Sequence, residues 1–336
     1  MGVNLTPIIK KKVVDLHYLS GRMIAFDANN VLYQFLALIR TPTGVPLSDK
    51  EGNITSHLAG LAFRATRLLC DYNIKLIYVF DGAPPGLKLK ELEKRREIKR
   101  RARVEWKEAM KAEDFATAFS KSTMTSSLTR DMIEDAQTML TYMGIPHVQA
   151  PSEGEAQAAY MTRDIFAASS RDYDTLLFGA TRQVRYVTIQ GREFLPSRGY
   201  SRKYEPEIIV LKEFLQHLDI TREQLVDLSI LMGNDFTRGI YGIGPKKGLK
   251  LIKEYGTLEN LPPELYDQLP EEIDEIRQIF LEPDVTDTYS LEYGEFQKEE
   301  LMDFLQEKNF SESNIQKIVK RMEAYFKKGN LERWLS

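Results

Sequence analysis

The sequences RMIAFD at residues 22–27 and KLIYVFD at residues 75–81 share one pattern, a short apolar run that ends in a carboxylate. Between them, residues 56–71 carry apolar side chains at helical spacing. A strand, a crossover helix and a second strand are typical of a βαβ unit in a parallel sheet. Residues 165–169 are predicted to form a further strand. Residues 184–189 alternate in character and are predicted to form an edge ribbon.

The bulk composition fits a globular α/β protein. The chain has 336 residues and a hydrophobic fraction of 43%, enough for a sizeable core. The apolar runs are too short to cross a bilayer, and the N-terminus has no signal-peptide stretch, so we expect an intracellular protein without a membrane partner. The single cysteine, Cys70, excludes an intramolecular disulfide. The net charge of −3 is not that of a uniformly basic protein, so the local distribution of charge matters more.

Seven carboxylates lie where an apolar segment should end or a helix should begin or stop. They are Asp27, Asp81, Glu153, Glu155, Asp172, Asp174 and Asp235. The carboxyl ends of parallel strands share one edge of a sheet, where ligands bind, so we expect the four aspartates up to residue 174 to lie there. Like charges gathered in one cleft need cations or protons. Clusters of carboxylate oxygens are the sites at which proteins hold Mg²⁺ or Mn²⁺.

Each carboxylate also has a structural alternative. Asp172 and Asp174 suit an acidic turn with Asx hydrogen bonds. Ser152 and Glu155 form an S-x-x-E capping box before the next predicted helix, and the helix dipole accounts for Glu153. Taken singly, most of the seven fit capping at least as well as metal binding. A metal site requires them to converge.

Residues 88–111 are dense in lysine and arginine, with glutamates between them. No apolar stripe is wide enough to demand burial, so we predict a protruding, solvent-facing helix. The structural alternative is an ordinary surface helix, stabilised by ion pairs between its basic and acidic side chains at i,i+4 spacing. The basic stretch at residues 94–103, just downstream of the candidate metal site, favours phosphate binding instead.

Helical periodicity dominates beyond residue 205. Helices are predicted over residues 156–161, 211–217, 221–232, 245–255, 297–307 and 312–326. Thr221 with Gln224 suits a capping box. In GIGPK at residues 242–246, two glycines let backbone N–H groups approach a phosphate, and a helix begins at Pro245. A structural turn is the simpler interpretation of a lone G-x-G motif.

The sequences around the carboxylates are long and ordered. They are VFDGAPP at residues 79–85, MGIP at 143–146, APSEGEAQA at 150–158, DYDTLLFG at 172–179, GND at 233–235 and GIGPK at 242–246. This series, over residues 1 to about 333, resembles the flap endonucleases of the XPG-type structure-specific 5′ nuclease family. The resemblance implies a 5′ flap endonuclease with 5′ exonuclease activity, which hydrolyses branched DNA in replication and repair. The short tail without a long basic extension is typical of archaeal members. We therefore expect the cytoplasm if the source is archaeal and the nucleus if it is eukaryotic.

The resemblance implies two Mg²⁺ ions per site, with Mn²⁺ able to substitute. Asp27, Asp81 and Glu155 would serve one ion, with Glu153 holding its waters. Asp172, Asp174 and Asp235 would serve the other, with Glu155 near both. Lys88 and Arg95 match residues that clamp the scissile phosphate. The implied catalytic set is Lys88, Arg95, Asp27, Asp81, Glu155 and Asp174.

Further matches concern DNA. Tyr33 matches a position that stacks on a base near the cut; a half-buried core tyrosine is the simpler interpretation. Gly2 matches a residue whose amino end lies near the site once Met1 is removed, and a loose myristoylation pattern is the alternative. The implied DNA-binding residues are Gly2, Tyr33, Lys94, Arg96, Gly242, Gly244, Lys246 and Lys247.

The resemblance also implies a division of the chain. The fold would be a mixed, mostly parallel central sheet flanked by helices, with an α/β nuclease core over residues 1–240 and a helical arch and cap insertion at 82–129. Residues 221–262 would form a helix–two-turn–helix module that grips duplex DNA and holds K⁺, although the hydroxyl residue that some members place near Gly239 is absent. Residues 263–327 would pack as helices on the core.

The tail over residues 328–336 resembles a sliding-clamp-binding peptide. Leu331, Trp334 and Leu335 are the expected clamp contacts, although Lys328 replaces the usual glutamine. An ordinary helix end is the alternative. Outside the clamp complex we expect a monomer.

Three other functions compete with a flap endonuclease. A non-catalytic branched-DNA-binding scaffold would have the same fold. A phosphotransferase or phosphatase would use the Asp172-x-Asp174 pair without the basic helix or the glycine turn. A lipid-anchored scaffold would carry its anchor on Gly2.

Overall fold

The computed structural model describes residues 2–41, 45–112, 114, 127–188, 191–195 and 200–335. For residues 90–92, 94–95, 107, 110, 191–195, 200–203 and 328–335 it describes the backbone alone. Part of the predicted arch, at residue 113 and residues 115–126, therefore lies outside the described residues, as does residue 189 of the predicted ribbon. The predicted side-chain roles of Lys94, Arg95, Leu331, Trp334 and Leu335 also lie outside them.

A mostly parallel seven-stranded sheet forms the centre of the fold, in the order β1-β9-β6-β5-β2-β3-β4. Its strands are β1 (Lys12–Val13), β2 (Met23–Asp27), β3 (Lys75–Phe80), β4 (His147–Gln149), β5 (Ala167–Ser169), β6 (Arg182–Arg185) and β9 (Glu207–Val210). Neighbours from β6 to β4 pair in parallel, whereas β9 is antiparallel to both β6 and β1. The predicted mixed, mostly parallel sheet is confirmed.

Both faces of the sheet are buried, and the pleat divides the core into two clusters. Ile24 and Phe26 of β2 point into one cluster, whereas Ala25 points into the other. The alternation follows from the period of two along a strand. It also explains why the strands are apolar almost throughout, as expected for a parallel sheet covered on both sides.

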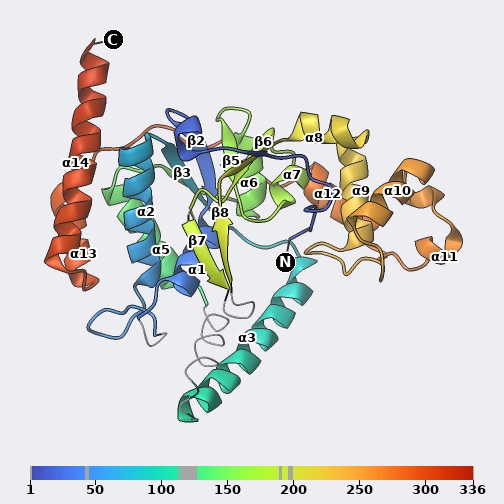
Figure 1. The fold of residues 1–336 in the computed structure, drawn as a ribbon, viewed down its shortest axis with the longest axis horizontal. Helices are drawn as coiled ribbons and strands as arrows, with labels where there is room; N and C mark the ends of the chain where they lie inside the picture. Colours follow the sequence, from blue (N-terminus) through green and yellow to red (C-terminus); the bar gives the residue numbers. More distant parts are fainter. Residues whose placement is uncertain are drawn as a thin grey trace.

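Helices cover each face, as Figure 1 shows. One side holds α1 (Ala28–Leu38), α2 (Ser56–Tyr72), α5 (Arg130–Tyr142), α13 (Lys298–Glu307) and α14 (Glu312–Leu335). The other holds α6 (Gly154–Met161), α7 (Asp174–Leu177), α8 (Leu211–Leu218), α9 (Arg222–Met232), α10 (Pro245–Tyr255), α11 (Pro263–Tyr266) and α12 (Ile273–Leu281). Two short 3₁₀ helices, at Leu16–Leu19 and Leu258–Asn260, also lie among the described residues. The remaining described helix, α3, does not cover the sheet.

The predicted edge ribbon at residues 184–189 is wrong. Val184 lies in β6, which has partners on both sides, β5 and β9. The ribbon of the protein is instead the separate hairpin of β7 (Gly191–Leu195) and β8 (Tyr200–Tyr204). The alternating sequence of residues 184–189 did not distinguish an interior strand from an edge strand, because both strand types share the period of two.

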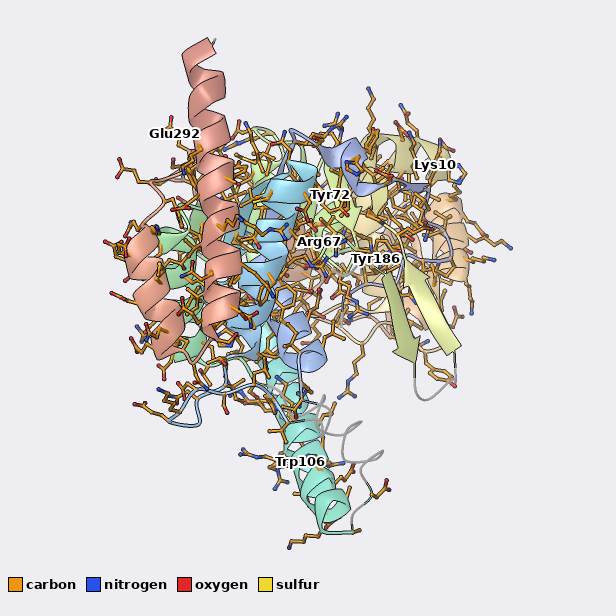
Figure 2. All side chains as sticks on the ribbon, turned by 60° about the vertical axis from the view of Figure 1, so that its left-hand side comes forward. Lys10, Arg67, Tyr72, Trp106, Tyr186 and Glu292 are labelled. Carbon is orange, nitrogen blue, oxygen red and sulfur yellow. The ribbon has the colours of Figure 1, made fainter. Side chains whose placement is uncertain are left out.

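The helix predicted over residues 88–111 is confirmed as α3 (Lys88–Lys111). It projects from the carboxyl edge of the sheet away from the rest of the molecule (Figure 1). Trp106 stands on its outer half, far from the core (Figure 2). Glu97 pairs with Arg100 and Arg101, the short-range pairs of a solvent-exposed helix. Within the described residues, no helix combines the length and apolar character that a membrane crossing requires.

Candidate active site

Asp27 is both the last residue of β2 and the N-cap of α1. Its Oδ1 accepts a hydrogen bond from the backbone N–H of Asn30 at 3.0 Å. Aspartate suits this position because its carboxylate satisfies an N–H that the helix leaves without a partner. Capping therefore fixes one oxygen of Asp27 and leaves the other for a ligand at the edge of the sheet. The side chain is 6% exposed.

Asp81 follows β3 and reaches the start of α6. Its Oδ1 accepts the backbone N–H of Gly154 at 2.7 Å, and its Oδ2 accepts the amide of Asn29 at 2.7 Å. A Cβ at position 154 would lie 2.8 Å from Asp81 Oδ1, so the approach requires glycine. The carboxylate thus joins three elements of the site, β3, α1 and α6.

The predicted capping box of Ser152 and Glu155 is wrong. The N-cap of α6 is Glu153, without a side-chain cap, and Glu155 accepts a hydrogen bond from Ser170 Oγ instead. The cause is tertiary: Ser152 O accepts the N–H of Gly82 at 2.6 Å, which fixes the chain before α6 against the β3–α3 turn. Glu155 is therefore directed toward the sheet edge.

Asp172 and Asp174 follow β5, but neither forms the predicted Asx turn. Asp174 Oδ1 accepts the backbone N–H of Val3, 171 residues away, at 2.8 Å. The N–H of Asp172 donates to Ser170 Oγ at 3.2 Å. Ser170 therefore joins the second acidic pair to Glu155, and Asp174 fixes the N-terminal segment over the site.

Lys88, the first residue of α3, inserts its ammonium among these carboxylates. Its Nζ donates to Glu153 and lies 3.7 Å from Asp235 Oδ2. Burial opposes the charged form, but the neighbouring carboxylates Glu153 and Asp235 outweigh it and raise the pKa of Lys88. The ammonium therefore stays charged and is the counter-ion of this part of the cluster.

Three further carboxylates of the cluster have raised pKa values. Burial, followed by the repulsion of Asp81, raises the pKa of Asp27 to about 8. Burial and Asp235 raise the pKa of Asp174 to about 7. Burial, with Asp174 next, raises the pKa of Glu155 well above its ordinary value. Asp27, Glu155 and Asp174 therefore each lie near other acidic residues of the set.

The donor set fits hard divalent cations, because it is rich in carboxylate oxygens. Within the described residues, no three histidine, cysteine or acidic side chains are close enough together to hold an ion as they stand. The Lys88 ammonium, paired with Glu153, occupies part of the cluster. Cation binding therefore requires the carboxylates to move closer together.

Gly2 lies against the second acidic pair. A Cβ at this position would be 2.5 Å from Asp174 Oδ2 and 2.7 Å from Asp172 Cβ. The glycine is therefore required by close packing. This places the amino end of the chain where the sequence predicted it, beside the site.

We predict that Gly2→Ala lowers the activity that the resemblance implies, flap cleavage, by about tenfold or more, because displacing a catalytic group by about 1 Å can slow a reaction up to a hundredfold. Steady-state cleavage of a labelled flap DNA measures the effect. Gly294→Ala is the matched control, since its Cβ would meet only an ordinary contact at 3.8 Å. Cleavage by Gly2→Ala within twofold of wild type would contradict the packing argument.

Tyr33 does not belong to the core. Its side chain is 37% exposed, and Lys99 of α3 donates to its hydroxyl at 3.3 Å with Nζ 4.7 Å from the ring centroid. The half-buried core interpretation is therefore wrong. The ring therefore lies between α1 and the projecting helix α3.

The glycine motif forms a tight turn before α10. The N–H of Ile243 donates to Ile240 O at 3.1 Å, and Gly242 has a φ of 78°, which favours glycine. Gly244 is the N-cap of α10, and Lys246 and Lys247 in its first turn are exposed. The turn and helix start thus present N–H groups and positive charge together.

Some functional candidates were missed by sequence reasoning. Asn29 and Ser170 orient Asp81 and Glu155, but a lone asparagine or serine carries no pattern that predicts such a contact.

A groove of about 870 Å³ also lies between α1, α2 and the start of α14, lined in part by Leu38, Phe63 and Phe310. Exposed apolar side chains identify this groove, and their exposure is visible only in the structure.

Comparisons with known proteins agree with this geometry. The XPG N-terminal domain matches residues 1–102, and the XPG I-region matches residues 144–235. Flap endonuclease 1 of Methanothrix thermoacetophila is 44% identical over 340 residues, covering 100% of both chains. Flap endonuclease 1 of Pyrococcus abyssi is 44% identical over 343 residues, covering 99% of this chain and 98% of the relative.

Solved structures show the same fold. Flap endonuclease-1 from Methanococcus jannaschii superposes with a TM-score of 0.77 at 39% identity, over 98% of this chain and 100% of that one. The catalytic core of Rad2 in complex with DNA substrate superposes with a TM-score of 0.67 at 23% identity, over 93% and 96% of the two chains. At that identity the second likeness concerns the fold alone.

Proposed function

The chain belongs to the flap endonuclease 1 family, and we propose on this premise that the seven carboxylates are its metal-dependent hydrolytic centre. The family makes the protein a structure-specific flap endonuclease, a hydrolase that acts on branched DNA. The observation that carries the proposal is the convergence of buried acidic residues whose pKa values are raised by one another. We further propose the 5′ polarity of cleavage and the associated 5′ exonuclease activity.

The proposed cofactor is a pair of Mg²⁺ ions, for which Mn²⁺ would substitute. Asp27, Asp81 and Glu155, supported by Glu153, would hold one ion, and Asp172, Asp174 and Asp235 the other. Two such ions, when bound, supply an activated water and charge stabilisation at the leaving 3′-oxygen. The hydrogen bonds from Asn29, Asn30 and Ser170 support this assignment, because they aim the ligand oxygens from fixed elements.

Lys88 and Arg95 would bind the scissile phosphate. Lys88 already lies in the acidic cluster, and its charge is maintained there. On metal binding its ammonium would leave Glu153 and turn to the phosphate oxygens, where it stabilises negative charge in the transition state. Arg95 lies two turns further along α3, so its position on that helix supports a second contact with the same strand.

The proposed DNA surface extends from α3 and Tyr33 across the site to α9 and α10. Lys94 and Arg96 of α3, with Gly2 at the site, would contact the flap strand. The glycine turn, the N-terminus of α10 and Lys246 and Lys247 would hold a duplex phosphate. We also propose K⁺ in the loop before this turn. The hydroxyl residue that some family members place near Gly239 is absent, but Thr237, two residues earlier, supplies a hydroxyl oxygen there, and its Oγ1 accepts the N–H of Gly239 at 3.3 Å.

The proposed contact with a sliding clamp rests on the sequence pattern of the tail, Leu331, Trp334 and Leu335. The backbone of α14 is helical to Leu335, and the end of this helix projects beyond the body of the molecule (Figure 1). That projection supports access for a partner. Outside such a complex we propose a monomer.

We predict that purified protein with Mg²⁺ makes one principal cut at the base of the 5′ flap of a double-flap DNA. Mapping the products from both ends of the labelled strand measures activity, polarity and position together, and chelation by EDTA is the control. Binding without metal-dependent cleavage would favour the non-catalytic scaffold. Turnover of a small phosphoester without cleavage of DNA would favour a phosphatase.

A further inference from the structure

Tyr241 is the most solvent-exposed large hydrophobic residue among those that the structure describes. Its relative exposure is 102%, whereas the next value is 54%, at Val13. Single apolar residues at a surface are ordinary, but most cover part of their ring or chain with neighbours. A ring that contacts nothing contributes no stability to the fold.

The turn that carries this ring is rigid. Tyr241 is the first central residue of the turn from Ile240 to Ile243, and Gly242 is the second. The isoleucines on both sides are 6% and 4% exposed and belong to the core beneath α9 and α10. The N–H of Ile240 also donates to Leu231 O at 2.9 Å. The ring is therefore held out on a fixed support, which lowers the entropy lost when it binds.

The surroundings of the ring are strongly basic. Residues 236–253 contain Arg238, Lys246, Lys247, Lys250 and Lys253 and no carboxylate. All five cationic side chains are exposed. A basic surface that carries an exposed aromatic residue is typical of a nucleic-acid interface.

We infer that Tyr241 contacts duplex DNA directly and supplies a part of the affinity that does not depend on salt. This inference rests on the proposed function, which brings a duplex to the start of α10. Phosphates there are bound by lysines and backbone N–H groups, and paired bases are stacked within the duplex. The apolar surface left for the ring is the deoxyribose edge of the backbone. The contact is therefore made by the ring and not by the hydroxyl.

The test measures the affinity of full-length protein for a double-flap DNA, without divalent metal, by fluorescence anisotropy from about 50 to 300 mM KCl. Tyr241→Ala should weaken binding about fivefold at every salt concentration, because it exposes apolar surface that the sugar had covered, with the slope of log K against log salt unchanged. Tyr241→Phe should bind as wild type does. Lys246→Ala, the control for an ionic contact, should reduce the slope by about one.

The outcomes separate the inference from the function on which it rests. Affinity of Tyr241→Ala within twofold of wild type, or a changed salt slope, overturns the role of the ring. Weakening by Tyr241→Phe equal to that of Tyr241→Ala overturns the assignment to the ring rather than the hydroxyl. A wild-type protein that binds no flap DNA at low salt overturns the proposed function instead.

Discussion

Replacing Asp174 with alanine is expected to abolish flap cleavage while flap binding survives. The carboxylate lies in the acidic cluster, where burial, then Asp235 and Asp172, raise its pKa, and it would hold one of the two metal ions. Losing about 4 kcal/mol of charge stabilisation slows a reaction about a thousandfold. Single-turnover cleavage and anisotropy of the same labelled flap DNA measure the two effects separately.

Asp174 also anchors the N-terminal segment, so a second variant is needed. Asp174→Asn keeps an oxygen for the N–H of Val3 but removes the negative charge. If the negative charge of Asp174 is required, Asp174→Asn loses cleavage as fully as Asp174→Ala does. It also loses Mg²⁺ binding, measured by calorimetry, to the same extent. Asp303→Ala, at an exposed position on α13, is the matched control and should behave as wild type. Undiminished cleavage by Asp174→Ala would remove this residue from the catalytic centre.

Replacing Lys88 with methionine is expected to slow cleavage by about 10² to 10³-fold and to tighten divalent-ion binding. The first effect follows from the loss of a preorganised cation at the scissile phosphate. The second follows because the Lys88 ammonium is paired with Glu153 and near Asp235, two proposed ligands, and so competes with a metal ion for them. Isothermal titration with Mg²⁺ in the absence of DNA measures this competition directly.

The two effects of Lys88→Met have opposite signs, which distinguishes them from general damage to the site. Lys111→Met, at the far end of the same helix, removes an exposed charge without touching the cluster. It should leave metal affinity unchanged. Metal binding by Lys88→Met that equals or falls below that of wild type would contradict the competition, whatever happens to cleavage.

Much of the fold could be predicted because several elements have strong local signals. The helices α2, α3 and α10 have clear periodicity or composition, and α10 also begins with proline and ends at Gly256. The capping box of α9, Thr221 with Gln224, formed as predicted. In contrast, β4 and β9 are only three and four residues long, too short for periodicity to identify them.

The candidate site was predictable in its residue types and its edge of the sheet, but not in its contacts. For Glu155 the structural alternative was a local capping box, yet its partner is Ser170. For Asp174 the alternative was a local turn, yet the partner is Val3. Both alternatives fail for the same reason, since local hydrogen bonds are the only ones that spacing along the chain can suggest.

By itself, the sequence determined the α/β class, the projecting basic helix and the membership of seven ordered carboxylates in one recognisable series. Only the tertiary structure decided that these carboxylates lie close enough to raise one another's pKa, that Lys88 lies among them and that Tyr241 faces open solvent. The physical reason is the distance along the chain over which each effect acts. Propensity and periodicity act over neighbouring residues, whereas burial and Coulomb repulsion depend on side chains that the fold brings together from distant parts of the chain.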